Sequence, residues 1–355
     1  MLVYWILLAF ASTFVLVRGT GAAHKITGQT SSLAMIVFAL YYIAIGALRF
    51  ETGGDWVAYE WKYTQISYGS LAFALDYTDP LFGLLNWISH KLGTGIYLVN
   101  GIVCAIIVAG VLRVSRLTRD PWLAIMISVP YILIVIGMGF VRQAAAIGLI
   151  LLALQTLERE RKLRSVFYLA LAAGFHSTSI VVFPLFLAAV SRRFLTYAAI
   201  VIGLSGYTYY SLFEPKLDAF QTGYLEAGYE SSGAFVRLMM SFVPAVVLLA
   251  RWRNFRLPGP SRPVWFLFAL GAIGLFGAYF ISPSSTAVDR VGLYFSVVQI
   301  AVFGELLNLV NFKQRDTLYL RVSAIALAIT IQVVWLFFAV HAGDWVPYNS
   351  ILEFA

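Results

Sequence analysis

Long apolar runs follow one another along almost the whole chain and are separated by short polar segments. A run of about 18 or more apolar residues is typical of a helix that crosses a bilayer. The pattern therefore predicts an all-α, polytopic integral membrane protein with about ten spans in a single transmembrane domain, 1–355. The predicted spans are Leu2–Val17, Ser31–Leu48, Gly95–Leu112, Trp122–Met138, Val141–Leu157, Phe194–Leu212, Ala234–Ala250, Val264–Ile281, Val291–Val310 and Leu318–Val340.

Basic residues collect in alternate segments between the runs, for example Arg113–Arg119 and Arg159–Arg164, and the segments between these are acidic or neutral. Short basic loops stay on the cytoplasmic side of a membrane. This places the N-terminus outside. It also predicts an external loop at 49–79 with an interfacial helix to 91, and a second external loop at 213–233.

The segment from Ser165 to Val190 breaks this alternation, because basic clusters flank it at both ends. It carries Gly174-Phe175-His176-Ser177 near its middle and Pro184 beyond. We predict a re-entrant or broken pair of short helices with His176 at the turn, near the outer side. Irregular backbone at that depth is tolerated only inside protein or beside a water-filled cavity.

Composition agrees with a membrane protein, since 61% of the residues are hydrophobic and 12% are charged. Soluble proteins carry about 25% charged residues. The net charge of +8 comes from the short loops, where it sets topology, so no nucleic-acid partner is expected. The single cysteine, Cys104, excludes a disulfide framework and a Cys/His metal cluster. We expect no cofactor and no bound metal.

Arg142 and Gln143 interrupt the apolar stretch between Pro121 and Leu157. An arginine inserted into a membrane costs roughly 2.5–3.5 kcal/mol unless a partner or water relieves it, and it cannot deprotonate. Its planar fork of donors suits phosphate oxygens. The alternative is an arginine that reaches lipid headgroups from a helix end. The functional interpretation is a phosphate-binding Arg142 with Gln143 as an auxiliary donor.

A second polar group, Arg49 to Asp55, follows the second predicted span. Gly53-Gly54 allows a tight turn, and Asp55 would begin a helix that carries Trp56 and Tyr59. Ordinary capping beside the membrane explains the group equally well. Glu51 and Asp55 are candidate general bases, although a carboxylate pair at this spacing is a weak signal.

Two further groups complete the set. His176 lies among apolar residues and is a candidate base because histidine titrates near neutral pH, or else a hydrogen-bonded structural residue. Asp289-Arg290 opens a predicted span, with Tyr294 one turn along from Arg290. Asp289 is a helix cap or a catalytic acid or base. Arg290 is a second candidate for an anionic head group.

Two other patterns carry less weight. Gly203-Leu204-Ser205-Gly206 matches the serine motif of rhomboid-like intramembrane proteases, but the only histidine downstream is His341, near the end of the chain. The acidic group Asp76 to Asp79 has no companion metal ligands in the sequence.

The order of these groups resembles the EpsG family of exopolysaccharide biosynthesis proteins, which are related in role to Wzy-type polymerases. The resemblance covers residues 40 to 300. Where many relatives have Gly-Thr-Asp-Tyr, this chain has Gly53-Gly54-Asp55-Trp56. The residues that carry the resemblance are Arg49–Asp55, Tyr59, Asp79-Pro80-Leu81-Phe82, Arg142-Gln143, Phe175-His176-Ser177, Asp289-Arg290 and Tyr294.

The resemblance implies a glycosyltransferase that polymerises undecaprenyl diphosphate-linked oligosaccharide repeat units into an exopolysaccharide or O-antigen chain. It places the reaction at the external face of the bacterial inner membrane, without a metal, and beside a possible chain-length regulator and flippase. Arg142 and one of Arg49 or Arg290 would hold the diphosphate. His176, or else Asp55, would take the acceptor's proton in one inverting transfer. The residues expected around the sugar are Trp56, Tyr59, Tyr294, Glu51 and Ser177.

Other functions remain open on the sequence. A flippase or transporter of the same lipid-linked sugar also needs basic groups in a cavity, but transporters often repeat an interrupted helix in both halves. Another glycosyltransferase acting on lipid-linked sugars, an acyltransferase that modifies surface sugars, and a scaffold of a polysaccharide assembly complex are the further alternatives.

Overall fold

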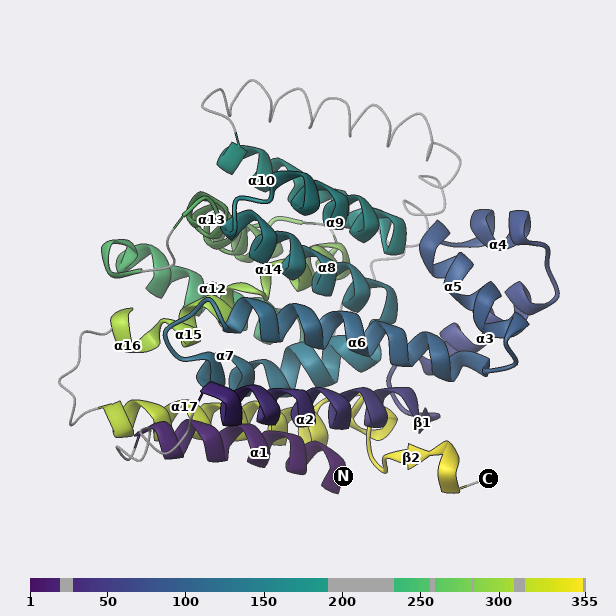
Figure 1. Ribbon diagram of the computed structural model, residues 1–355, viewed down its shortest axis with the longest axis horizontal. Coiled ribbons are helices and arrows are strands. Elements are labelled where there is room, and N and C mark those ends of the chain that lie inside the picture. The colour runs from purple at the N-terminus through teal and green to yellow at the C-terminus, as the bar shows by residue number, and fades with distance from the viewer. Residues whose placement is uncertain (20–27, 191–232, 256–258, 283, 310–316, 354–355) are drawn as a thin grey trace.

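A computed structural model describes residues 1–19, 28–190, 233–255, 259–282, 284–309 and 317–353. The described residues form a bundle of helices, with α3, α4 and α5 grouped at one end beside β1 and β2 (Figure 1). The elements of the first half are α1 (Leu2–Gly19), α2 (Gly28–Ala47), β1 (Arg49–Phe50), α3 (Trp56–Ser67), α4 (Leu71–Tyr77), α5 (Pro80–Lys91), α6 (Gly95–Ser115), α7 (Pro121–Ser128), the π-helix η2 (Val129–Gly139) and α8 (Val141–Glu158).

The second half continues the bundle with shorter and more often interrupted helices. They are α9 (Lys162–Phe175), η3 (Ser177–Val182), α10 (Phe183–Val190), α12 (Ala234–Ala250), η5 (Trp252–Asn254), α13 (Arg262–Tyr279), α14 (Ser285–Phe295), α15 (Val298–Gly304), α16 (Leu306–Leu309), α17 (Thr317–Val333), η7 (Val334–Phe338), η8 (Ala342–Asp344), β2 (Asn349–Ser350) and η9 (Ile351–Glu353).

The helices agree with the predicted class, an all-α protein that crosses the membrane several times. Six helices within the described ranges are long and apolar enough to cross a membrane, or seven if α14 and α15 form one bent span. Those two helices meet at 41°, so the predicted span Val291–Val310 is not one straight helix. The predicted count of ten is not confirmed. The predicted span Phe194–Leu212 and residues 213–232 of the predicted loop 213–233 lie outside the described residues.

The centre of the bundle is formed by α7, η2 and α8. Every residue from Trp122 to Gly139 is buried. Pro130, the second residue of η2, has no backbone N–H to donate and so interrupts the regular α-helical bonding. The wider turns leave carbonyls for side-chain donors, and the Tyr42 hydroxyl donates to the Leu133 carbonyl at 2.7 Å. Irregular backbone in a membrane is tolerated at such an enclosed position.

Two glycines bring α6 and α8 into backbone contact. A Cβ atom at Gly148 would lie 2.6 Å from Ile107 Cα, and one at Gly110 would lie 2.5 Å from the Gly148 carbonyl oxygen. Close approach through small residues is the usual packing mode where lipid removes the hydrophobic driving force between helices. This contact fixes the start of α8, where Arg142 lies.

Buried ion pairs join the helices at one end of the bundle. Asp120, which caps α7, contacts Arg321 of α17 at 2.5 Å and Arg18 of α1 at 3.5 Å. Both Asp120 and Arg321 are buried, so each neutralises a charge that would otherwise be costly in a membrane. Asp120 of the α7 cap therefore holds α1 and α17, which lie near opposite ends of the chain, against α7.

The opposite end holds the interruptions in the helices. The segment Ser165–Val190 is broken at His176, whose extended backbone separates α9 from η3. The segment 49–91 contains three short helices, and α5 occupies Pro80–Lys91, where an interfacial helix is predicted. The two-residue strands β1 and β2 pair antiparallel, with Arg49 opposite Ser350. This pairing brings the residues after η7 to the loop that contains Gly53.

The contact between α6 and α8 gives the first test. We expect Gly148→Val to lower the free energy of unfolding by about 2 kcal/mol, because the added methyl groups overlap the α6 backbone. The measurement is the midpoint of thermal unfolding in detergent. Gly274→Val on α13 is the matched control, since nothing lies within 4 Å of a Cβ atom there. Equal midpoints for the two variants would contradict the packing described.

Candidate functional site

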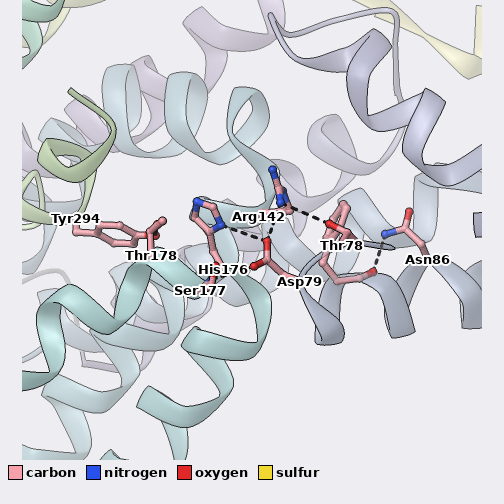
Figure 2. Close-up of polar contacts among 9 residues, drawn as sticks. Thr78, Asp79, Asn86, Arg142, His176, Ser177, Thr178 and Tyr294 are labelled. Atoms are coloured by element: carbon pink, nitrogen blue, oxygen red, sulfur yellow. Dashed lines mark hydrogen bonds and ion pairs between the residues drawn. The ribbon is translucent and has the colours of Figure 1, made fainter. Parts of the chain in front are cut away.

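The carboxylate of Asp79 is the centre of a polar cluster. Arg142 donates from Nη1 to Asp79 Oδ2 at 2.7 Å, and His176 Nδ1 lies 3.2 Å from the same oxygen. The Ser177 backbone N–H donates to Oδ1 at 3.0 Å. Figure 2 shows Arg142 and His176 converging on Asp79 from different helices. One carboxylate thus connects three segments that are distant in sequence.

Each of these residues lies at a helix end. Asp79 precedes Pro80, which opens α5 with a fixed φ and no orphaned N–H. Arg142 is the second residue of α8, directly after the break at Phe140. His176 ends α9, and the following Ser177 amide begins η3. Backbone donors at such helix ends lack intrahelical partners, so a carboxylate placed there satisfies them.

Burial and hydrogen bonding set the protonation states. Burial alone would raise the pKa of Asp79, but the bond to His176, the nearby positive charges and the Ser177 N–H lower it to about 2. Burial lowers the pKa of His176 below its usual value, and Asp79 opposes that shift. At neutral pH Asp79 is therefore ionised and His176 is neutral. Nδ1–H donates to Asp79, which leaves Nε2 as the acceptor.

Aromatic and hydroxyl groups surround the cluster. Tyr59 of α3 faces Arg142. Thr178 and Tyr294 share a hydrogen bond of 2.9 Å, and the Tyr294 ring lies 6.5 Å from the His176 ring. Figure 2 shows Tyr294 and Thr178 on the far side of His176 from Asp79. The buried Tyr294 ring therefore packs beside the imidazole.

Arg142 retains capacity to bind an anion. Its contacts with Asp79 and with the Thr78 hydroxyl, at 3.4 Å, both use Nη1. In the described part of the chain, Nε of Arg142 has no hydrogen-bond partner. The side chain is 28% exposed, so a ligand can reach it. Lys62, one turn after Tyr59, is a further cation whose charge interacts with Arg142, Asp55 and Asp79.

A second, looser pair lies beside the first cluster. Arg290 Nη1 is 3.9 Å from Asp55 Oδ2, and the guanidinium also lies 4.4 Å from the centre of the Phe140 ring. Gln143 Nε2 donates to the Arg290 carbonyl at 2.9 Å, which connects α8 to α14. Burial raises the pKa of Asp55, and Arg290 opposes this shift. Both side chains are more than one-third exposed, so this pair can open for a ligand.

The segment after η7 adds two ionisable residues to the same region. His341 Nδ1 lies 3.4 Å from Asp344 Oδ2, and the Asp344 carbonyl accepts from the Gly53 N–H at 2.7 Å. Both residues also act electrostatically on Asp55. Residues near both ends of the chain therefore border one site.

Three predicted site residues, Arg49, Glu51 and Trp56, lie apart from the ion-pair cluster. Arg49 is buried, donates to the Met138 carbonyl and to Asn100 Oδ1, and lies 5.7 Å from the centre of the Trp56 ring. Met138 is in the last turn of η2, so its carbonyl has no intrahelical donor. Glu51 is exposed and has a left-handed φ of 44°. Arg49 therefore connects β1 to η2 beneath the site.

Asp289 is engaged by a residue that the sequence pattern did not single out. Arg237 of α12 donates to both carboxylate oxygens of Asp289, at 2.9 and 2.8 Å. Both side chains are nearly buried. A bidentate pair of this kind holds α12 against α14. Asp289 thus has a structural partner where the sequence suggested a cap or a catalytic group.

The residues that sequence reasoning missed as site members are Asp79, Lys62, Arg237, His341 and Asp344. Asp79 had a signal in its place before Pro80, at the start of a predicted helix. Lys62 and Tyr59 are three residues apart, which puts them on one helix face. Among the described residues, no group of three or more His, Cys, Asp or Glu side chains is placed to hold a metal ion.

The arrangement combines a neutral imidazole held by a carboxylate with cations that can receive an anion. An oriented imidazole can take a proton from a hydroxyl group, and nearby guanidinium groups can stabilise a departing phosphate. This chemistry suits group transfer from an activated phosphate ester.

Comparison with known proteins identifies one family. The model of the EpsG family matches residues 32–350, which is most of the chain. No curated protein and no solved structure matches the chain.

The central carboxylate gives a second test. Because its pKa is lowered to about 2, ionised Asp79 stabilises the fold above about pH 4 by about 2 kcal/mol, and this is lost as the pH falls toward 2. We expect Asp79→Asn at neutral pH to increase hydrogen exchange at the Ser177 amide by roughly 30-fold. Exposed Asp76→Asn is the control and should leave that amide unchanged. An unchanged rate in Asp79→Asn would show that the carboxylate does not hold η3.

Proposed function

The chain belongs to the EpsG family of Wzy-like polysaccharide polymerases, and on that premise we propose its substrate, its membrane face and its site residues. It transfers undecaprenyl diphosphate-linked oligosaccharide repeat units to a growing polysaccharide, at the external face of the bacterial inner membrane. The observation that carries this proposal is the cluster of Asp79, Arg142 and His176 at one end of an apolar bundle. The basic loops are predicted at the other end of the bundle, which favours the end with the cluster as the external one.

The diphosphate is held by Arg142, Lys62 and Arg290. Arg142 offers the exposed part of its side chain. Lys62 adds a charge beside Arg142, and the 3.9 Å separation of Arg290 from Asp55 leaves its guanidinium free to turn toward an anion. Arg49 is assigned a positioning role, because it is buried and its Nη1 and Nη2 atoms donate to Met138 and Asn100 in the interior. Trp56, Tyr59 and Tyr294 are buried and are assigned positioning roles beneath the sugar site.

The transfer step is a displacement at the anomeric carbon of the donor sugar. The acceptor hydroxyl oxygen forms the new glycosidic bond while its proton passes to Nε2 of His176. The bond between the anomeric carbon and the diphosphate oxygen breaks, and the electron pair leaves with the lipid diphosphate. Arg142 and its neighbouring cations stabilise the charge that develops. Asp79 fixes the tautomer of His176, and Ser177 holds Asp79 through its amide.

Asp55 is assigned to the acceptor side with Asp344 and His341, where carboxylates can accept hydrogen bonds from sugar hydroxyls. Asp289 is assigned a positioning role through Arg237. A chain-length regulator and a flippase that delivers the lipid-linked sugar are the proposed protein partners, in keeping with a polymerase whose substrate is assembled on a lipid.

The proposed base gives a pH dependence. His176 must be neutral to accept a proton, so elongation should fall as the pH drops through its pKa, which lies below 6.5. Asp79 raises that pKa, so Asp79→Asn should move the fall to lower pH and reduce the plateau rate by roughly 100-fold. Initial rates between about pH 5 and 8 in nanodiscs measure this. If the residual activity of His176→Gln keeps the same acid limb, the titrating base is another group, with Asp55 next to test.

The polymerase itself is tested with purified protein in nanodiscs and an undecaprenyl diphosphate-linked repeat unit. A ladder of lengthened products is expected on a gel. Arg142→Ala should abolish the ladder because the diphosphate loses its main donor, and Arg142→Lys should retain part of it, since lysine keeps the charge without the fork. His176→Ala should remove elongation but keep binding of the lipid-linked sugar. Binding by the wild type without any ladder would favour a flippase over a polymerase.

A further inference from the structure

A large apolar cavity lies between α12 and the pair α17–η7. Its volume is about 620 Å³, and the packed helices η2 and α15 form its inner wall. Its lining includes Val236 and Val243 of α12, Leu327 of α17 and Val334 of η7. These four side chains are each between 43% and 53% exposed. In a membrane they face the hydrocarbon, so the cavity is a lateral groove open to the bilayer.

One end of the groove reaches the candidate site by two routes. Arg237 lines the groove and holds Asp289, the neighbour of Arg290 in the chain. His341 also lines it and contacts Asp344, whose carbonyl binds the Gly53 amide two residues before Asp55. The apolar channel therefore ends beside the pair of Arg290 and Asp55. A molecule lying in it would present its polar end to the Arg290 guanidinium.

We propose that this groove binds the polyprenyl chain of the lipid-linked sugar, with the diphosphate toward Arg290. This inference rests on the proposed function and adds the place of the lipid tail. On α12 the lining runs from Gly233 to Pro244, about 16 Å of helix, which accommodates a few isoprene units of an extended chain. Met239 and Met240 add flexible apolar surface that adapts to a branched chain.

The groove fits a tail that enters from the bilayer while its head group reacts outside. A fully enclosed cavity would require the long tail to be threaded, whereas a lateral opening admits it directly. The remaining units of the chain would stay in the surrounding lipid. Burial of the first units fixes the distance between the membrane and the diphosphate, which places the anomeric carbon near His176.

Two tryptophan substitutions fill the groove from its lipid-facing rim: Val243→Trp and Val334→Trp. The matched controls are Val246→Trp on α12 and Val322→Trp on α17, which are 41% and 49% exposed and lie outside the groove. The probe is undecaprenyl diphosphate without sugar, bound to the full chain in nanodiscs. We expect roughly tenfold weaker binding for the two groove variants and unchanged binding for the two controls.

Geranyl diphosphate supplies a head group with a tail too short to fill the groove, and all four variants should bind it like the wild type. The inference is overturned if the groove and control variants bind undecaprenyl diphosphate alike, or if the groove variants lose geranyl diphosphate equally. It is also overturned if phosphatidylglycerol displaces undecaprenyl diphosphate at equal concentration, because the groove would then hold bulk lipid.

Polymer formation is measured separately in the same variants. If the wild type forms a ladder and all variants bind the tail equally, the polymerase proposal stands and the groove proposal is rejected. If only the groove variants lose tail binding and the wild type forms no ladder, the groove proposal is supported and the polymerase proposal is rejected. The two proposals thus fail independently.

Discussion

The ionised carboxylate of Asp79 is the interaction on which the candidate site depends. It joins the starts of α5 and α8 to the end of α9, through Arg142, His176 and the Ser177 amide. A charge in this position is stable only while its donors surround it, since burial alone would favour the neutral acid. The same contacts hold His176 in one tautomer. Structure and proton chemistry are therefore set by one group.

The sequence was informative where a polar residue interrupts an apolar run. Arg142 and His176 were predicted in this way, and the structure brings them together. Asp79 gave little signal, because an acid in a polar segment is common and its partners lie 63 and 97 residues away. Arg49 shows the limit of the rule. It has the same kind of sequence context as Arg142, but it is buried and its Nη1 and Nη2 atoms donate to the Met138 carbonyl and Asn100 in the interior.

The fold followed the apolar pattern in most of its helices, and departed from it where backbone geometry changes. Pro130 turns the second part of a predicted span into a π-helix, and the predicted span Val291–Val310 is divided between α14 and α15. Hydropathy reports how apolar a segment is and carries no information on how its carbonyls are satisfied. Hydropathy likewise could not predict the pairing of Asp289 with Arg237, because the partner lies on another helix 52 residues away.

The pairing of β1 with β2 has a consequence for biogenesis. Asp79, Arg142 and His176 all emerge from the ribosome before the second half of the chain, so their cluster can form early in membrane insertion. Arg290 arrives later, and the Asp344 carbonyl that holds the Gly53 loop arrives near the end. A nascent chain therefore carries an incomplete site until its last segment returns to the first loop. Synthesis itself thus delays assembly of the complete candidate site until the last segment is in place.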